Sequence, residues 1–342
     1  MKGKILVTGG TGYIGAHTVV ELQNAGFEVV IIDNLSNSTA DVVGQIEKIS
    51  GKRPEFHQLD MLNFELLEAF FAESKELCSV IHFAAYKAVG ESVIKPLMYY
   101  RNNLLSLLNL FECMGKYKVE HLVFSSSCTV YGQPEMLPVT EETPRKAAES
   151  PYGNTKIVCE DIIRDYSKAN PRLKCIALRY FNPIGAHPSA LIGELPRGIP
   201  GNLVPFVTQT VAGLRDELQV FGDDYNTPDG SCIRDFINVV DLAKAHVIAV
   251  ERLLNRKNES GYEYFNIGTG KGVSVLELLN AFEQATGQKI KYRIVGRRAG
   301  DIEKIFANTT KANNVLGWKS VVSLEETLLS AWNWEKRIRG IE

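Results

Sequence analysis

The segment that most constrains the fold is a short apolar run that ends in a glycine-rich turn and leads into a helical pattern, KILVTGGTGYIG from Lys4. From there to about Tyr180, short β-branched runs alternate with longer amphipathic stretches. Parallel strands joined by right-handed helical crossovers produce this alternation, so the sequence predicts an α/β fold built on a doubly wound parallel sheet. The further runs that we interpret as strands are EVVIIDN, CSVIHFAAY, HLVFSSSCTVYG and KCIALRYFNP, and those of helical period are GAHTVVELQNAG, NFELLEAFFAES and LLSLLNLFECMGKY.

The composition and the periodicity of the sequence change after residue 180. A stretch rich in Pro and Gly, NPIGAHPSALIGELPRGIPGN, has little periodicity and predicts a long loop that crosses into a second lobe. We expect a first lobe over residues 1–180 and a smaller C-terminal α/β lobe over residues 181–342, with segments of the second threading back to the first. The later elements that we predict are a strand over Arg234–Val240, a helix over Asp241–Leu254 capped by Asp241, a strand and turn in YEYFNIGTG, and a helix over Ser274–Thr286 with a capping box between Ser274 and Glu277.

The composition of the 342-residue chain excludes several classes of protein. Hydrophobic residues make up 45% and charged residues 23%, and the net charge of −2 offers no positive field to nucleic acid or to an anionic membrane. No run approaches the roughly 20 apolar residues that span a bilayer, and the first apolar run is too short for a signal peptide. The six cysteines are scattered and the six histidines lack ligand-like spacing, so we expect reduced thiols, no metal site and a cytoplasmic protein.

The glycine turn has the spacing Gly9-x-x-Gly12-x-x-Gly15. Glycines at these positions permit a tight turn, let the backbone approach a pyrophosphate and let the helix pack close to the strand, while the helix N-terminus offers free N–H groups to the phosphates. The second predicted strand ends at Asp33, where a carboxylate can accept hydrogen bonds from an adenosine ribose and repels a 2′-phosphate. Together these features predict a Rossmann-type dinucleotide site that binds NAD in preference to NADP.

A candidate catalytic pair, Tyr152 and Lys156, lies four residues apart and would share one face of a helix. A phenol with an ordinary pKa of about 10 is a poor base at neutral pH, but a nearby ammonium and a cationic nicotinamide both stabilise the phenolate. Tyr152 would remove a proton from a substrate hydroxyl and Lys156 would hold the cofactor ribose. Ser127, at the carboxyl end of a predicted strand, can bond the same substrate oxygen, whereas we interpret Ser125 and Ser126 as strand caps.

These motifs together resemble the extended short-chain dehydrogenase/reductase family and, within it, the UDP-glucose 4-epimerases. The resemblance covers nearly the whole chain, and K-A-V-G-E-S, R-Y-F-N-P-x-G-A-H and R-R-x-G-D are its most specific parts. It implies a UDP-sugar substrate whose C4 configuration is inverted through a transient 4-keto intermediate, with enzyme-bound NAD regenerated in each cycle. It also implies that a pair of helices in the first lobe joins two chains into a homodimer, for which the apolar stretch Leu104–Phe111 is a candidate, although that stretch could equally belong to the core.

The resemblance also assigns binding residues. The expected cofactor-binding residues are Gly9, Gly12, Tyr13, Ile14, Gly15, Asp33, Asn34, Asn37, Ser38, Asp60, Met61, Phe83, Ala84, Lys87, Asn102, Tyr152, Lys156 and Phe181. The expected substrate-binding residues are Ser127, Asn182, Asn202, Leu203, Gln219, Val220, Phe221, Arg234, Arg298, Asp301 and Ile305.

The chain departs from the family pattern at several places in the expected sugar pocket and beside the cofactor. The departures are Cys128 for the usual Ala, Ala85-Tyr86 for Gly-Leu, Gly201-Asn202 for two asparagines, and Leu195 for the Asp of a G-E-D-P motif. In this family a bulky aromatic shortly after the R-R-x-G-D motif excludes N-acetyl groups from the sugar pocket. Ile305 is smaller, so we expect activity on UDP-GlcNAc and UDP-GalNAc, although Ile305 could also be a packing residue in the strand-like KIFAN.

Two other functions fit the same scaffold. A nucleotide-sugar 4,6-dehydratase needs an Asp-Glu pair after the strand-end serine or threonine, and here Cys128 and Thr129 follow Ser127 instead. A non-enzymatic, NAD-sensing protein would not need the intact set of Ser127, Tyr152 and Lys156.

Overall fold

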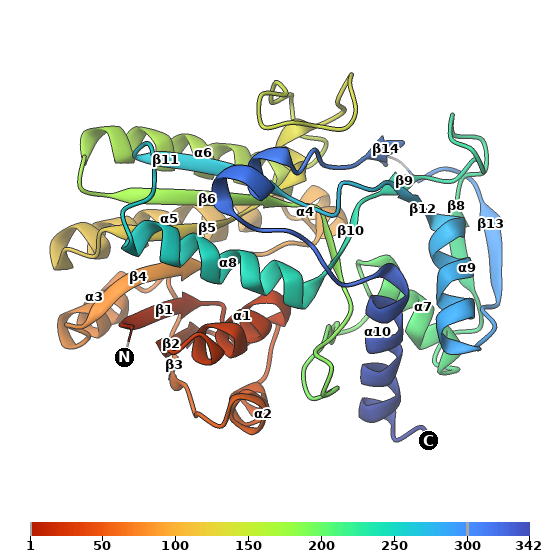
Figure 1. Cartoon of the computed structure of the whole chain (residues 1–342), viewed down its shortest axis with the longest axis horizontal. Coiled ribbons are helices and arrows are strands. Elements are labelled where there is room, and N and C mark those ends of the chain that lie inside the picture. The colour runs from red at the N-terminus through yellow and green to blue at the C-terminus, as the bar shows by residue number, and fades with distance from the viewer. Residues whose placement is uncertain (1, 299–300) are drawn as a thin grey trace.

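The computed structural model describes residues 2–298 and 301–342, and its first lobe is a three-layer α/β sandwich. A seven-stranded sheet of parallel strands has the order β11-β6-β5-β4-β1-β2-β3 (Figure 1). This confirms the predicted doubly wound sheet. The strands are β1 (Lys4–Thr8), β2 (Glu28–Asp33), β3 (Glu55–Gln58), β4 (Leu77–His82), β5 (His121–Ser127), β6 (Lys174–Tyr180) and β11 (Tyr262–Ile267).

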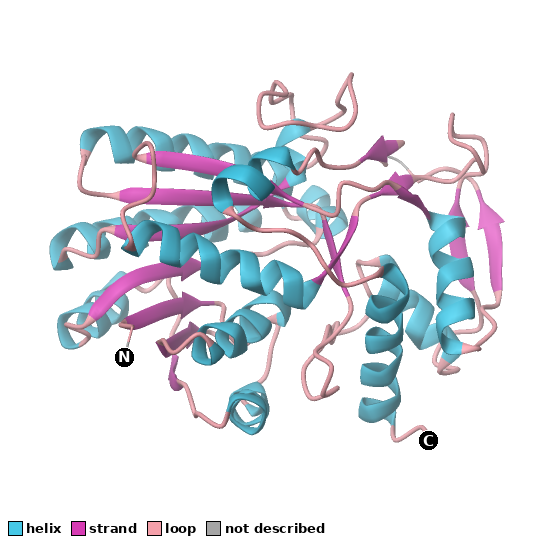
Figure 2. Ribbon diagram, in the orientation of Figure 1, coloured by secondary structure: helices cyan, strands magenta, loops and turns pink. Residues whose placement is uncertain are grey.

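Both faces of this sheet are apolar because successive side chains of a strand point to opposite sides. Ile5 and Val7 of β1 belong to one buried cluster, against the helices α1 (Tyr13–Asn24) and α8 (Val239–Leu254). Leu6 belongs to the other cluster, against α3 (Phe64–Glu73), α5 (Pro96–Tyr117) and α6 (Pro151–Ala169). Figure 2 shows the resulting helix–sheet–helix layers. The helices of this lobe are α1 (Tyr13–Asn24), α2 (Asp41–Ser50), α3 (Phe64–Glu73), α4 (Val89–Ile94), α5 (Pro96–Tyr117), α6 (Pro151–Ala169) and α8 (Val239–Leu254), with a 3₁₀ turn η1 (Cys128–Tyr131).

The second lobe is smaller and lies beside the carboxyl ends of the parallel strands (Figure 1). Its helices pack around a separate apolar cluster that includes Val207, Phe282 and Trp332. The helices of this lobe are α7 (Leu203–Val211), α9 (Val275–Thr286) and α10 (Leu324–Arg339). The short strands are β7 (Asn182–Ile184), β8 (Leu218–Phe221), β9 (Ile233–Arg234), β10 (Phe236–Asn238), β12 (Val273–Ser274), β13 (Tyr292–Val295) and β14 (Lys304–Ile305), and η2 (Ala312–Leu316) is a π-helical turn.

The chain passes between the lobes more than once after residue 180. Helix α8 packs on the large sheet, and β11 is its edge strand, paired with β6. Residues 239–267 therefore belong structurally to the first lobe, and the lobes are not two contiguous halves of the sequence. None of the described helices is long and apolar enough to cross a membrane.

Several element boundaries differ from the sequence prediction. The expected strand over Arg234–Val240 is two short strands, and helix α8 begins at Val239 with Asn238 as its N-cap, not Asp241. The Asn238 side chain accepts hydrogen bonds from the backbone N–H groups of Val240 and Asp241, at 2.8 and 3.3 Å. The Asp241 carboxylate instead accepts from the backbone of the segment before α10.

Three further elements, α9, β5 and β7, can be compared with the sequence prediction. The capping box that starts α9 at Ser274 and Glu277 is confirmed. The strand in HLVFSSSCTVYG ends at Ser127, as expected, and the 3₁₀ turn η1 follows from Cys128. The stretch that was expected to be a loop contains the short strand β7, which pairs with β10.

Candidate active site

The glycine turn between β1 and α1 has the geometry that a dinucleotide requires. Gly9 has φ +69°, in the left-handed region that favours glycine, and a Cβ at Gly15 would lie 2.2 Å from the Gly9 carbonyl oxygen. Helix α1 follows Gly12 without a side-chain cap, so its first N–H groups remain free to bond phosphate oxygens. The turn therefore fits the diphosphate of NAD.

Asp33 lies at the carboxyl end of β2 and is held in place by the neighbouring loop. Its carboxylate accepts hydrogen bonds from the Thr11 backbone N–H at 3.2 Å, the Leu35 backbone N–H at 2.9 Å and the Ser38 hydroxyl at 3.2 Å. These bonds fix the carboxylate next to the glycine turn, in the position expected for an acceptor of the adenosine ribose.

A single cavity of about 2130 Å³ runs from the glycine turn to the second lobe. Every cofactor- and substrate-binding residue expected from the sequence lines it, and so do the three expected catalytic residues. The structure thus brings the whole predicted set together, and the role of each residue remains a prediction.

The three candidate catalytic side chains lie on two adjacent elements at the floor of this cavity. Ser127 ends β5, and Tyr152 and Lys156 follow Ser150, which caps α6 by accepting a bond from the Gly153 N–H at 3.2 Å. The Lys156 Nζ donates to the Ser125 carbonyl oxygen at 2.7 Å and lies 5.9 Å from the centre of the Tyr152 ring. The cap therefore sets the register of a helix that points both side chains at the end of β5.

Burial changes the acid–base properties of this pair. Burial lowers the pKa of Lys156 to about 8, while nearby Cys159 and Glu160 oppose that change. Burial raises the pKa of Tyr152 above its ordinary value, the Cys128 thiol adds to the increase, and a hydrogen bond with Ser127 acts in the opposite direction. The phenol is thus a weak acid, and positive charge close to its oxygen is needed before it can serve as a base.

A buried ion pair behind the site was not predicted from the sequence. The Arg179 guanidinium donates to both carboxylate oxygens of Glu160, at 2.9 and 2.6 Å, and the Ser126 hydroxyl donates to Glu160 at 2.5 Å. Ser125 pairs with the Tyr180 hydroxyl. Ser125 and Ser126 are therefore not strand caps as expected, because their side chains tie β5 to α6 and β6. The one available signal was that Glu160 lies four residues after Lys156 and so shares its helix face.

The second-lobe end of the cavity carries opposite charges close together. Arg298 donates to the Asp301 carboxylate at 2.6 Å, and the Arg234 guanidinium lies 3.8 Å from the same oxygen. The Arg298 guanidinium also lies 5.4 Å from the centre of the Phe221 ring. Two forked donors beside an aromatic face suit a nucleoside diphosphate, because guanidinium groups bond phosphate oxygens in pairs.

The part of the cavity around Ile305 is apolar. Ile305 is 2% exposed and packs in a cluster with Cys128 and Phe181. Asp235, another residue that the sequence analysis missed, anchors this region by accepting bonds from the Thr269, Gly270 and Ala307 backbone N–H groups, at 2.8, 3.1 and 3.1 Å. Burial raises the pKa of Asp235, although these bonds act against the increase.

Comparisons with known proteins agree with this geometry. The profile of the family described as GDP-mannose 4,6 dehydratase matches residues 6–330. UDP-glucose 4-epimerases from Dictyostelium discoideum and from Bacillus subtilis (strain 168) are each 51% identical to the chain over 97% of its length, and the matches cover 95% and 96% of those proteins. The crystal structure of UDP-glucose 4-epimerase from Bifidobacterium longum in complex with NAD+ and UDP is 46% identical, with a TM-score of 0.94 over 99% of this chain and 100% of that one.

Two kinds of evidence indicate the same family. The cavity joins the dinucleotide turn to Ser127, Tyr152 and Lys156, and the UDP-glucose 4-epimerases compared above are about 50% identical to the chain over nearly its whole length. The chain belongs to the UDP-glucose 4-epimerase family of the extended short-chain dehydrogenase/reductases.

Proposed function

We propose that the protein interconverts UDP-galactose and UDP-glucose by inverting C4 of the sugar with enzyme-bound NAD. The observation that carries this proposal is that one cavity joins the glycine turn, the catalytic constellation and the arginine cluster of the second lobe. A dinucleotide at one end and a nucleoside diphosphate at the other would place both reacting groups over Ser127 and Tyr152.

The chain's own residues supply proton transfer and positioning. Tyr152 takes the proton from the sugar 4-hydroxyl as a phenolate, and Ser127 bonds the same oxygen. Lys156, held by the Ser125 carbonyl, lends positive charge to the phenolate and a donor to the cofactor ribose. NAD, which the glycine turn and Asp33 would hold, would supply the hydride-transfer chemistry at C4 when bound. Tyr152 then returns the proton to the inverted hydroxyl.

A 4,6-dehydratase is the alternative on this scaffold, and the residues at its key positions do not support it. That reaction needs an acid and a base after the strand-end residue. Cys128 and Thr129 occupy these positions, and burial raises the pKa of the Cys128 thiol to about 12, so it offers no thiolate at neutral pH.

The experiment that tests the proposal is incubation of the purified protein with UDP-galactose, without added NAD, while UDP-glucose is measured. Product formation is the expected result, because the cofactor is regenerated in each cycle and stays bound. A folded, NAD-loaded protein that forms no product would overturn the proposal. Measurement of 4-keto-6-deoxy sugar in the same samples would reveal dehydratase activity.

Activity on the N-acetylated substrates UDP-GlcNAc and UDP-GalNAc is a second part of the proposal. Its support is that Ile305 lines the cavity beside Cys128, where a larger aromatic side chain would reduce the space for a 2-acetamido group. Ile305→Tyr should lower kcat/KM for UDP-GalNAc by more than tenfold while leaving UDP-galactose nearly unchanged, and Ile305→Leu serves as the volume-matched control. A wild-type rate on N-acetylated sugars equal to background would refute this part.

We also propose that the protein is a cytoplasmic homodimer joined through α5. Leu107, Leu110 and Phe111 of this helix are buried in the lobe, whereas Leu97, Leu105 and Leu108 are 81, 38 and 42% exposed. The stretch that the sequence left open is thus divided between core and surface. Light scattering after size-exclusion chromatography should give twice the mass of one chain for the wild type and the mass of a single chain for Leu108→Glu.

A further inference from the structure

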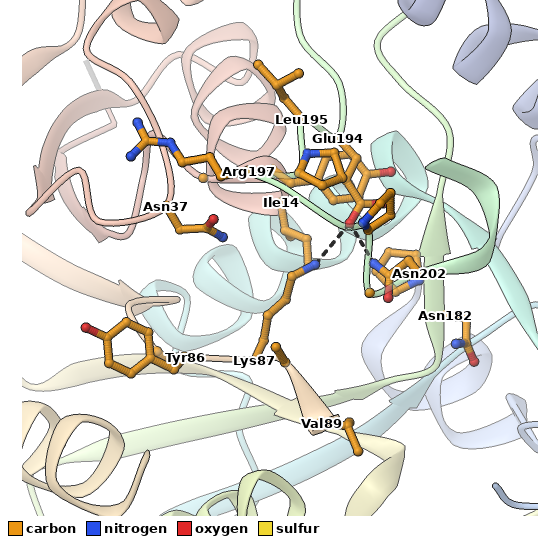
Figure 3. A pocket seen from close by; sticks show the side chains of 18 of the residues that line it. Ile14, Asn37, Tyr86, Lys87, Val89, Asn182, Glu194, Leu195, Arg197 and Asn202 are labelled. Carbon is orange, nitrogen blue, oxygen red and sulfur yellow. Dashed lines mark hydrogen bonds and ion pairs between the residues drawn. The ribbon is translucent and has the colours of Figure 1, made fainter. Parts of the chain in front are cut away.

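Glu194 lies between the two ends of the cavity and bonds a residue from each. It belongs to the segment that leads from β7 to α7, and one carboxylate oxygen accepts from Lys87 Nζ at 3.1 Å and from Asn202 Nδ2 at 2.6 Å (Figure 3). Lys87 follows β4 in the first lobe, and Asn202 immediately precedes α7 in the second. A single oxygen atom thus links the two lobes across the cavity.

The second lobe fixes the backbone at this position. A Cβ at Gly193 would lie 2.5 Å from Trp334 Cγ, so the segment runs flat against the indole ring of α10. The Trp334 Nε1–H donates to the Glu194 carbonyl oxygen at 3.0 Å. The Glu194 side chain is only 13% exposed, whereas that of its partner Lys87 is 47% exposed, so the protein restrains the carboxylate more than the ammonium. The carboxylate is therefore held at a defined point rather than free to follow either partner.

The Asn202 side chain donates its hydrogen bond to Glu194 and does not cap its own helix. It occupies the N-cap position of α7, yet makes no side-chain cap bond there. Its amide is oriented by Glu194, and the free N–H groups of the α7 N-terminus line the same cavity as Asn202 and Leu203. The position of this amide consequently depends on the same carboxylate that holds the Lys87 ammonium.

We propose that Glu194 is a positioning residue that couples the binding of NAD to the binding of the uridine nucleotide. The inference rests on the proposed function and on the positions that the family resemblance implies, with Lys87 at the cofactor and Asn202 at the UDP moiety. A nucleotide that immobilises Asn202 also immobilises Glu194, and Glu194 then keeps Lys87 in place at the cofactor. Bound UDP accordingly tightens the binding of NAD and slows its release. Bound NAD lowers the dissociation constant of UDP by the same factor as UDP lowers that of NAD, because coupling between two binding sites is reciprocal.

Arg197 provides an internal contrast three residues further along the same segment. Its guanidinium donates to the carbonyl oxygens of Leu35 and Ser36, at 3.2 and 3.4 Å, and to that of Ser38. Arg197 thus ties the segment to the loop after β2, and within residues 2–298 and 301–342 its guanidinium forms no hydrogen bond to the UDP side of the cavity. Its loss should speed NAD release equally with and without UDP.

The test measures the rate of NAD release from the purified holoenzyme with and without saturating UDP, by trapping free NAD with a coupled dehydrogenase. The coupling is the ratio of the two rates. We expect UDP to slow release at least tenfold in the wild type, within the range usual for linked sites. Glu194→Ala should bring the ratio close to one, and Glu194→Gln should retain part of it, because a neutral amide still accepts from Asn202 but attracts Lys87 weakly.

Controls separate this role from a general loosening of the segment. Ile199→Ala, at a highly exposed position of the same segment, should leave the ratio unchanged, and Arg197→Ala should raise both rates by the same factor. Asn202→Ala should remove the UDP effect, and adding Glu194→Ala to it should change the ratio no further. This non-additivity is what a shared link predicts.

A wild-type ratio of one would overturn the proposal, and so would a Glu194→Ala protein that folds and keeps the full UDP effect. If Glu194→Ala releases NAD too fast to isolate, the UDP dissociation constant measured with and without excess NAD gives the equilibrium coupling, which should also fall close to one in this variant. The outcome is independent of turnover. A protein without epimerase activity but with a Glu194-dependent ratio would refute the proposed reaction and not the coupling. An active epimerase whose ratio does not depend on Glu194 would refute the coupling and not the reaction.

Discussion

Glu160→Gln should destabilise the protein by about 3–5 kcal/mol, the range seen when one partner of a buried ion pair is removed. The side chains of Arg179 and Glu160 are 4 and 1% exposed, so no water replaces the lost charge. Glutamine keeps one acceptor oxygen but turns an NH₂ group toward a guanidinium donor, which leaves a buried cation without its counter-ion. Ser126, which donates to the same carboxylate, loses a charge-assisted bond as well.

The assay is urea unfolding of the NAD-free protein followed by far-UV circular dichroism, with free energies compared at a common m-value. For 342 residues the unfolding entropy is about 0.7 kcal/mol/K, so the same loss lowers Tm by about 4–7 °C in a single transition. The matched control is Glu251→Gln, whose partner Lys2 lies at 2.7 Å but is 53% exposed, and which should change stability by less than about 1 kcal/mol.

A double variant tests the physical cause. Methionine at both Glu160 and Arg179 removes the charges together, and it should be less destabilised than Glu160→Gln alone because no ion remains unpaired. Part of the loss should persist, since Arg179 also donates to the Tyr131 hydroxyl at 3.0 Å. Equal effects of the Glu160 and Glu251 substitutions would refute the reasoning.

Three further outcomes are expected. Tyr152→Phe should lower kcat by about 10²–10⁴-fold without loss of bound NAD, as absorbance and mass analysis of the holoenzyme would check, because the phenol is proposed as the base. Asp33→Ser should reduce the preference for NAD over NADP at least tenfold in measured dissociation constants; an unchanged preference would contradict the ribose assignment. Burial lowers the pKa of His82, which bonds the Thr8 hydroxyl at 2.8 Å, to about 3. The unfolded chain therefore binds a proton near pH 6.5 that the folded chain excludes. The free energy of unfolding accordingly falls by about 1.6 kcal/mol between pH 6.5 and 5 through this group, and His82→Asn should make it less dependent on pH in that range.

The parts of this protein that local chemistry determines were predictable from its sequence. Glycine spacing, strand-end acids and the Tyr152–Lys156 interval depend on residues close together in the chain, and capping at Ser274 is equally local. The predicted start of α8 was wrong because Asn and Asp are both good N-cap residues, so the sequence alone does not distinguish Asn238 from Asp241. In the structure the Asp241 carboxylate accepts hydrogen bonds from the segment before α10, and Asn238 caps the helix instead.

The residues that the sequence did not reveal act through distant partners. Glu194 meets Lys87 across 107 positions, and Asp235 meets the Ala307 N–H across 72. No periodicity relates such positions, and each side chain alone is typical of a solvated surface. Arg179 gives no better signal, since an arginine in an apolar strand is recognised as paired only when the opposing helix is known.

The return of β11 to the edge of the large sheet has a consequence for biosynthesis. As the chain emerges from the ribosome, residues 1–180 form a sheet whose last strand, β6, has one side unpaired until residue 267 has been made. An uncovered strand edge is a template for pairing with other chains, and the apolar face that α8 covers is also bare at this stage. A nascent chain stalled near residue 180, or the same fragment expressed alone, should consequently aggregate or recruit chaperones rather than fold as a free-standing unit.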